Sequence, residues 1–117
     1  MPLTATEIAV AFSSQNYDEV EAYLAESIFW DLVAANPRLD KGEVLVLLRG
    51  TKLNLKVLTS TVLEQRVIDG GDTVVVDSVI EYVDSNGEKS VVSSCDLFEF
   101  EGGLVTHIRS YSGERSF

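Results

Sequence analysis

The fold is decided by residues 73–112, which read TVVVDSVIEYVDSNGEKSVVSSCDLFEFEGGLVTHIRSYS. Apolar and polar residues alternate through much of this stretch, as is typical of half-buried β-strands. Two turn-forming sequences, Asp84-Ser85-Asn86-Gly87 and Gly102-Gly103, interrupt the alternation. The stretch therefore predicts two hairpins that join three consecutive strands, at 73–83, at 89–101 and from 104 to about 112.

The preceding residues add another strand and three helices. Alternation from Leu53 to Val67 predicts a long strand, which the sequence Asp69-Gly70-Gly71-Asp72 turns into the next one. Earlier residues show helical spacing behind three capping-box pairs, Thr4 with Glu7, Asn16 with Glu19, and Asp40 with Glu43. We expect the second helix to reach Leu24, a short strand at 28–33, and Gly50 to end the third helix. Helices followed by consecutive hairpins predict an α+β domain with an antiparallel sheet.

Length and composition limit the function classes. The chain has 117 residues, of which 45% are hydrophobic, and this fits one domain (1–117) with a buried core. It shows neither an apolar run of about 20 residues nor a secretory signal, and its single cysteine, Cys95, cannot form an intrachain disulfide. A formal charge of −10 opposes nucleic acid and membrane surfaces as partners. We therefore expect a cytoplasmic protein.

Residues 91–111, which read VVSSCDLFEFEGGLVTHIRSY, resemble the end of the ketosteroid isomerases. There an aspartate precedes a Phe-x-Phe strand, a glycine turn and a final strand. With the order of elements, this makes nearly the whole chain similar to the nuclear transport factor 2-like superfamily, which includes those isomerases and the SnoaL-like polyketide cyclases. The resemblance implies a cystatin-like curved antiparallel sheet wrapped around N-terminal helices, with a conical pocket. It also implies acid–base chemistry on a small hydrophobic carbonyl compound, with no cofactor and no metal.

The resemblance assigns roles to individual residues. Asp96 falls at the isomerase position whose aspartic acid stabilises the enolate oxygen. The catalytic-base position falls near Leu32, and a shift of one residue in that strand would place Asp31 there, so both stay candidates. The pocket tyrosine of the isomerases falls near Ile8, which has no hydroxyl.

The residues themselves also single out Asp96. Strand alternation places it on one face with Val92, Ser94, Phe98 and Phe100. A carboxyl among aromatic rings loses hydration, which raises its pKa and suits it to donate a hydrogen bond or to act as a base near neutral pH. The alternative is a structural role, in which Asp96 bonds to a neighbouring hydroxyl such as Ser94 or lies on the outer face.

The remaining pocket residues depend on hairpin register. A three-residue loop after Asp84 pairs that residue with Glu88, places Val76 opposite Asp96 and points Asp77 outward. A two-residue turn would instead bring Asp77 opposite Asp96. The alternation of apolar residues favours the three-residue loop. We expect the candidate catalytic residues Asp96 and Asp31 to share a pocket lined by Phe12, Trp30, Leu32, Leu47, Ser78, Ser94, Phe98, Ile108 and Ser110.

The outer sheet face predicts an interface. His107 is the only histidine, and alternation places it outside with Arg109 and Tyr111, where it lacks the partners of a zinc site. Together with Val91 and Leu97 these residues predict a homodimer through the convex face. Three functions stay open: an isomerase- or cyclase-type enzyme, a non-catalytic module that binds a hydrophobic ligand, and a dimerisation or docking domain.

Overall fold

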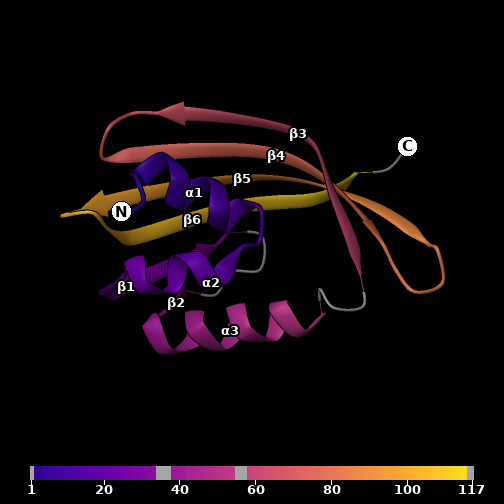
Figure 1. The fold of residues 1–117 in the computed structure, drawn as a ribbon, viewed down its shortest axis with the longest axis horizontal. Coiled ribbons are helices and arrows are strands. Elements are labelled where there is room, and N and C mark those ends of the chain that lie inside the picture. The colour runs from indigo at the N-terminus through magenta and orange to yellow at the C-terminus, as the bar shows by residue number, and fades with distance from the viewer. Residues whose placement is uncertain (1, 34–37, 55–57, 116–117) are drawn as a thin grey trace.

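The computed structural model describes residues 2–33, 38–54 and 58–115. Its helices are α1 (Ala5–Ser13), α2 (Tyr17–Val20) and α3 (Lys41–Asn54), with a 3₁₀ turn, η1, at Glu21–Tyr23. One six-stranded sheet has the order β2-β1-β6-β5-β4-β3 (Figure 1). The strands are β1 (Leu24–Leu32), β2 (Arg38–Leu39), β3 (Thr59–Asp69), β4 (Thr73–Val83), β5 (Lys89–Glu101) and β6 (Leu104–Arg115). This curved, open sheet with helices confirms the predicted α+β fold.

The hairpin between β4 and β5 has the predicted three-residue loop. The backbone N–H of Asp84 donates to the carbonyl of Glu88 at 3.0 Å, and the Asp84 carboxylate accepts from the backbone of Asn86 and Glu88 at 2.8 and 2.9 Å. This register places Val76 opposite Asp96. Asp77 consequently points outward, with 51% of its side chain exposed.

The first strand enters the sheet next to the last one. β1 pairs in parallel with β6, with Trp30 beside Ile108 and Leu32 beside Ser110. The sequence predicted only the antiparallel hairpin pairs, because no local turn signal records a contact between strands so far apart along the chain. The pairing aligns Leu32, Ser110 and Asp96 in one row across β1, β6 and β5.

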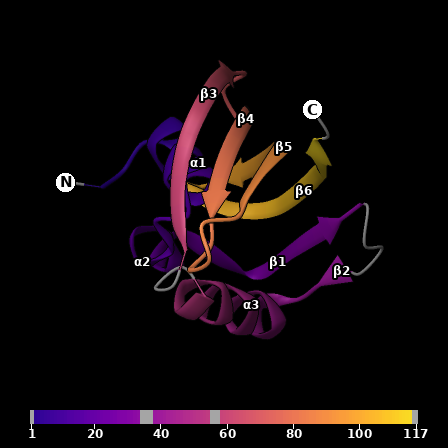
Figure 2. The ribbon, with the colours of Figure 1, turned by 90° about the vertical axis from the view of Figure 1, so that its right-hand side faces the viewer.

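The core lies on the inner face of the sheet. Figure 2 shows the strands curling from β3 through β6 to β1, with α1 and α2 on the inner side. The Phe12 ring of α1 contacts Tyr17, Trp30 and Phe98 edge-on, at centroid distances of 5.5, 5.1 and 5.3 Å. α3 adds Val44 and Leu48 to the same apolar cluster. In the described part of the chain, no helix is both long and apolar enough to cross a membrane.

The second helix is shorter than predicted. Asn16 makes no side-chain cap, α2 ends at Val20, and Leu24 already belongs to β1. Leu24 pairs there with Val105 of β6, and its carbonyl accepts a 2.7 Å hydrogen bond from Nζ of Lys41. These long-range contacts outweigh the helical spacing of a short segment, because a helix this short has little stability of its own.

The third helix is longer than predicted. It passes Gly50 and continues to Asn54, so Leu53 is helical and the following strand begins only at Thr59. Residues 55–57 of the predicted strand lie outside the described residues. Gly50 does not have the positive φ of a C-terminal glycine cap. The cost of an interior glycine, about 1 kcal/mol, is offset by the burial of Val44 and Leu48.

Candidate functional site

Asp96 lies at a cavity of about 200 Å³ on the inner face of the sheet, here called the Asp96 cavity. The residue is 8% exposed. β5 supplies Asp96, β6 supplies Ser110, β1 supplies Trp30, and the C-terminal end of α1 supplies Ser13. Because the inward positions of three neighbouring strands converge with a helix end, the sheet register fixes the site.

Both oxygens of the Asp96 carboxylate accept hydrogen bonds from serines. The Ser13 hydroxyl donates to Oδ2 at 2.8 Å, and the Ser110 hydroxyl donates to Oδ1 at 2.6 Å. Ser110 in turn accepts a 2.7 Å hydrogen bond from Nε1 of Trp30. These hydrogen bonds orient the carboxyl group without placing a positive charge beside it.

The surroundings of Asp96 favour its neutral form. Burial raises the pKa of the Asp96 carboxyl, and the hydrogen bonds from Ser110 and Ser13 oppose that rise only partly. Among the described residues, no lysine, arginine or histidine forms an ion pair with it. A buried carboxyl without a cation can hold its proton at a higher pH than an exposed one.

Tyr17 brings a second polar group to the Asp96 cavity. Its side chain is 8% exposed, and burial raises its pKa, with the nearby charges of Tyr82 and Asp96 as smaller causes. No described residue hydrogen-bonds to the Tyr17 hydroxyl. Every fully buried side-chain oxygen among the described residues does have a hydrogen-bond partner. The Tyr17 hydroxyl is therefore not fully buried, and its raised pKa keeps it protonated, so it can donate to a ligand in the cavity that Tyr17 lines.

A wider hollow of about 570 Å³ adjoins the Asp96 cavity and shares Gln15 and Tyr82 with it. We call it the mouth. Nε2 of Gln15 donates to the Tyr82 hydroxyl at 2.6 Å, and Gln15 has a φ of 67°, which is uncommon for a residue other than glycine. Three carboxylates also line the mouth, those of Asp84, Glu88 and Glu114.

The predicted pocket residues fall into three groups. Those that line the Asp96 cavity are Phe12, Trp30, Leu32, Ser94 and Ser110. Three others, Ser78, Phe98 and Ile108, are at most 1% exposed and belong to the packed interior instead, outside the cavity lining. Leu47 lines a separate groove beside α3.

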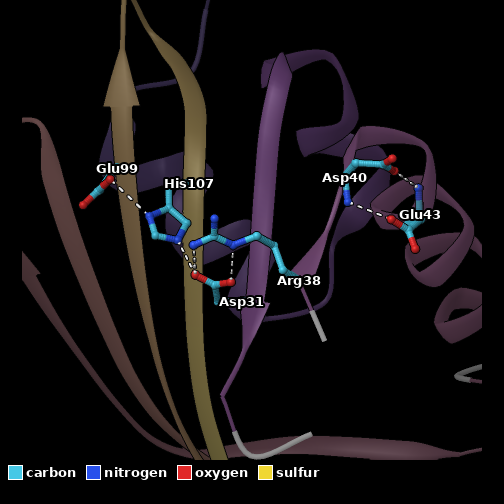
Figure 3. A network of polar contacts seen from close by, with 6 residues as sticks. All are labelled: Asp31, Arg38, Asp40, Glu43, Glu99 and His107. Atoms are coloured by element: carbon cyan, nitrogen blue, oxygen red, sulfur yellow. Dashed lines mark hydrogen bonds and ion pairs between the residues drawn. The ribbon is translucent and has the colours of Figure 1, made fainter. Parts of the chain in front are cut away.

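Asp31 lies on the opposite face of the sheet from Asp96, so the hypothetical one-residue shift does not occur. Leu32 lines the cavity, and its neighbour Asp31 therefore points outward. Figure 3 shows the Asp31 carboxylate between Arg38, whose Nε donates at 2.8 Å, and His107, whose Nε2 lies 2.8 Å away. Hydrogen bonds from Arg38 and His107 hold the pKa of Asp31 well below its usual range. Asp31 thus belongs to an outer ion-pair network.

His107 lies on the outer face, as strand alternation predicted. Its Nδ1 is 3.3 Å from a Glu99 oxygen, and its ring packs edge-on against Phe29. Within residues 2–33, 38–54 and 58–115, no three histidine, cysteine, aspartate or glutamate side chains are grouped so that they could hold a metal ion.

Sequence reasoning found the strand residues of the Asp96 cavity but missed those near the end of α1. Strand alternation places Ile80, Tyr82, Val92 and Ser112 on the inner faces of their strands, and all four line the cavity. Ser13, Gln15 and Tyr17 had no such signal. They lie at or just after the end of α1, where the angle between helix and sheet decides which side chain reaches the cavity.

Comparisons with known proteins support the same fold. The model of the SnoaL-like domain family matches residues 5–108. An NTF2-like protein of unknown function from Cytophaga hutchinsonii is 27% identical, with a TM-score of 0.78 over 91% of this chain and 93% of that one. No curated protein matches the sequence.

Two more distant structures share the fold alone. An LEH-like epoxide hydrolase from M. tuberculosis is 20% identical, with a TM-score of 0.65 over 89% of this chain and 75% of that one. A Catenulispora acidiphila protein with a ketosteroid isomerase-like fold, in complex with trimethylamine, is 15% identical, with a TM-score of 0.67 over 93% and 86%. With the family match across residues 5–108, the curved sheet and its helices establish that this chain belongs to the SnoaL-like domain family, within the nuclear transport factor 2-like superfamily.

Proposed function

We propose that this protein binds a small hydrophobic carbonyl compound in the Asp96 cavity and that Asp96 exchanges a proton with it. The observation that carries the proposal is the buried Asp96 carboxyl, which is held by Ser13 and Ser110 and has no cationic partner among the described residues. A neutral carboxyl can donate a hydrogen bond to a carbonyl oxygen.

The chemistry would be enolisation next to the carbonyl. Asp96 and Tyr17 would donate hydrogen bonds to the oxygen, which becomes more negative as the α-proton leaves. Donors in an apolar cavity stabilise that charge more than water does, because they are already oriented. Asp96 is the one carboxyl group among the described lining residues, so it would give its own proton to the carbonyl oxygen while a water molecule passes the α-proton back to the same carboxylate. The products of this step are the enol and a protonated Asp96.

A carboxyl NMR titration tests the proposal, with Asp96→Asn assigning the signal and Asp77→Asn as a control on an exposed carboxylate. We expect the pKa of Asp96 to lie above the usual 3.8. Cyclohexanone should raise it further, because a carbonyl oxygen binds the protonated form. A normal pKa that the ketone leaves unchanged would refute the Asp96 mechanism.

A second candidate is binding of a small alkylammonium ion without chemistry. The cavity is lined by four aromatic residues and by a carboxylate without a cationic partner among the described residues, a setting that suits organic cations. The aromatic residues are Phe12, Tyr17, Trp30 and Tyr82. The fold neighbour from Catenulispora acidiphila was solved with trimethylamine. The same titration separates the two candidates, because a cation binds the ionised carboxylate and would lower the pKa of Asp96.

We also propose that the chain forms a homodimer through its convex sheet face. Ile68, Val75 and Leu97 lie in one row across β3, β4 and β5, on the side opposite the core. Ile68 is 60% exposed, and Tyr111 on β6 is 44% exposed. The described helices pack on the other side of the sheet, so a second copy is the simplest cover for these side chains.

A further inference from the structure

An apolar groove lies between the first half of α3 and the ends of β1 and β2. Its volume is about 610 Å³, and we call it the α3 groove. The side chains of Leu32, Leu39, Val46 and Leu47 supply its apolar wall. The sequence had placed Leu47 in the pocket around Asp96, but its side chain lines this neighbouring space instead.

The α3 groove presents apolar surface to water. Val46 is 70% exposed, more than any other large apolar side chain among the described residues. Its neighbour Leu47 packs partly against the core. An aliphatic or aromatic chain in the groove would remove both surfaces from water, which is favourable in proportion to the apolar area covered.

Leu32 lies between this groove and the candidate site, because it lines both the α3 groove and the Asp96 cavity. It lies beside Ser110, which lies beside Asp96, in one row across three neighbouring strands. Two strand spacings amount to about 10 Å. A molecule that is held at Asp96 therefore needs a chain of about that length to pass Leu32.

We propose that the α3 groove holds the apolar chain of the compound whose carbonyl oxygen meets Asp96. This inference rests on the proposed function and names its substrate class: an elongated ketone or related carbonyl compound with a polar head and an alkyl or aryl tail. Leu32 separates the two parts, so it is the residue that determines the chain length the site accepts.

The mouth offers a poorer place for such a tail. Asp84, Glu88 and Glu114 line it, and an apolar chain there would displace water from their carboxylates. Removing hydration from charged groups without replacing it is unfavourable. Asp40 and Glu43 also line the α3 groove, but each carboxylate accepts a hydrogen bond from the other residue's backbone N–H, and the rest of the wall is mostly aliphatic. The cost of this kind is therefore smaller there.

The test compares the affinities of methyl ethyl ketone and methyl dodecyl ketone, whose chain is long enough to pass Leu32, by NMR chemical-shift titration of the intact protein. We expect each methylene that enters the groove to raise affinity about fourfold. In Val46→Asp the affinity for methyl dodecyl ketone should fall towards that for methyl ethyl ketone, while the latter keeps its wild-type value. Val46 is exposed, so this variant should fold.

Leu53→Asp is the matched control, because Leu53 is also an exposed α3 residue, at 64%, and does not line the groove. Equal effects of the two variants, or equal affinities of the two ketones in the wild type, would overturn the inference and leave the proposed function intact. If neither ketone binds, or if Asp96→Asn binds both as the wild type does, the proposed function fails and the inference fails with it.

Discussion

Ser110 lies directly opposite Asp96 across the β5–β6 ladder, and its hydroxyl donates a 2.6 Å hydrogen bond to that carboxylate. Oγ of Ser110 also accepts a 2.7 Å hydrogen bond from the indole N–H of Trp30. One serine therefore satisfies two buried groups on two other strands. Its loss would leave the Trp30 N–H and Oδ1 of Asp96 without a partner, while Ser13 would still donate to Oδ2.

Ser110→Ala should therefore destabilise the fold and shift the titration of Asp96. An unsatisfied buried donor costs about 1–3 kcal/mol, so we expect the free energy of unfolding in urea to fall by that amount. The pKa of Asp96 should rise above its wild-type value, because the Ser110 hydrogen bond lowers it. Ser94→Ala, on the same face of β5 as Asp96, is the control. It should change neither the free energy of unfolding nor the pKa of Asp96.

The pH dependence of stability should reveal the raised pKa of Asp96. Because the folded pKa lies above the usual 3.8, the folded state prefers the protonated carboxyl. The contribution of Asp96 to the free energy of unfolding is fully present below pH 3.8 and is lost as the pH rises through the folded pKa. Urea unfolding across this window should show wild type losing stability relative to Asp96→Asn. A constant difference between the two proteins would contradict the raised pKa.

Asp31→Asn should show the opposite dependence. The pKa of Asp31 is lowered by Arg38 and His107, so its contribution is present above pH 3.8 and is lost as the pH falls towards the folded value. Unfolding curves should therefore show the variant as less stable than wild type near neutral pH, and the gap should close in acid. Because Asp31 lies outside the cavity, ketone binding should be unchanged; weaker binding would argue against this separation.

Tyr17→Phe should separate stability from ligand binding. Its hydroxyl has no partner among the described residues, so its removal should leave the unfolding midpoint nearly unchanged. Cyclohexanone affinity should fall about fivefold, the loss expected for one hydrogen bond of about 1 kcal/mol. Tyr111→Phe, which alters an exposed outer-face ring, is the control. Unchanged affinity in Tyr17→Phe would remove Tyr17 from the site.

Val75→Asp should convert the proposed homodimer to a monomer. A charge in the middle of the apolar row, between Ile68 and Leu97, would be buried without a partner in the interface. Light scattering after size-exclusion chromatography gives the mass directly, and Leu53→Asp on α3 should remain dimeric. A monomeric wild type would disprove the interface.

Local sequence signals predicted the parts of the fold that local contacts hold. Thr4 and Glu7 form the capping box of α1. Asp84 closes its loop with its own side chain, so the register that turns Asp96 inward and Asp77 outward could be deduced from a few residues. The placement of Asp96 among buried side chains followed from strand alternation alone.

Contacts between distant segments were not predictable in this way. The helical spacing of Tyr17, Val20 and Leu24 is real, but Leu24 pairs with Val105 and joins the sheet. Similarly, Ser13 ends α1 as part of a polar run, and only the packing of that helix against β5 brings its hydroxyl to Asp96. The identity of these partners depends on the assembled fold.

The parallel pairing of β1 with β6 has a consequence for folding during synthesis on the ribosome. Translation proceeds from the N-terminus, so the segment that becomes β1 is made before its partner β6, with β2, α3, β3, β4 and β5 in between. Until β6 is made, Ile28 and Trp30, both buried in the finished fold, lack their neighbouring strand. Pairing between distant segments is slow to form, and exposed apolar strands aggregate. The nascent chain should therefore be the form of this protein most dependent on chaperones.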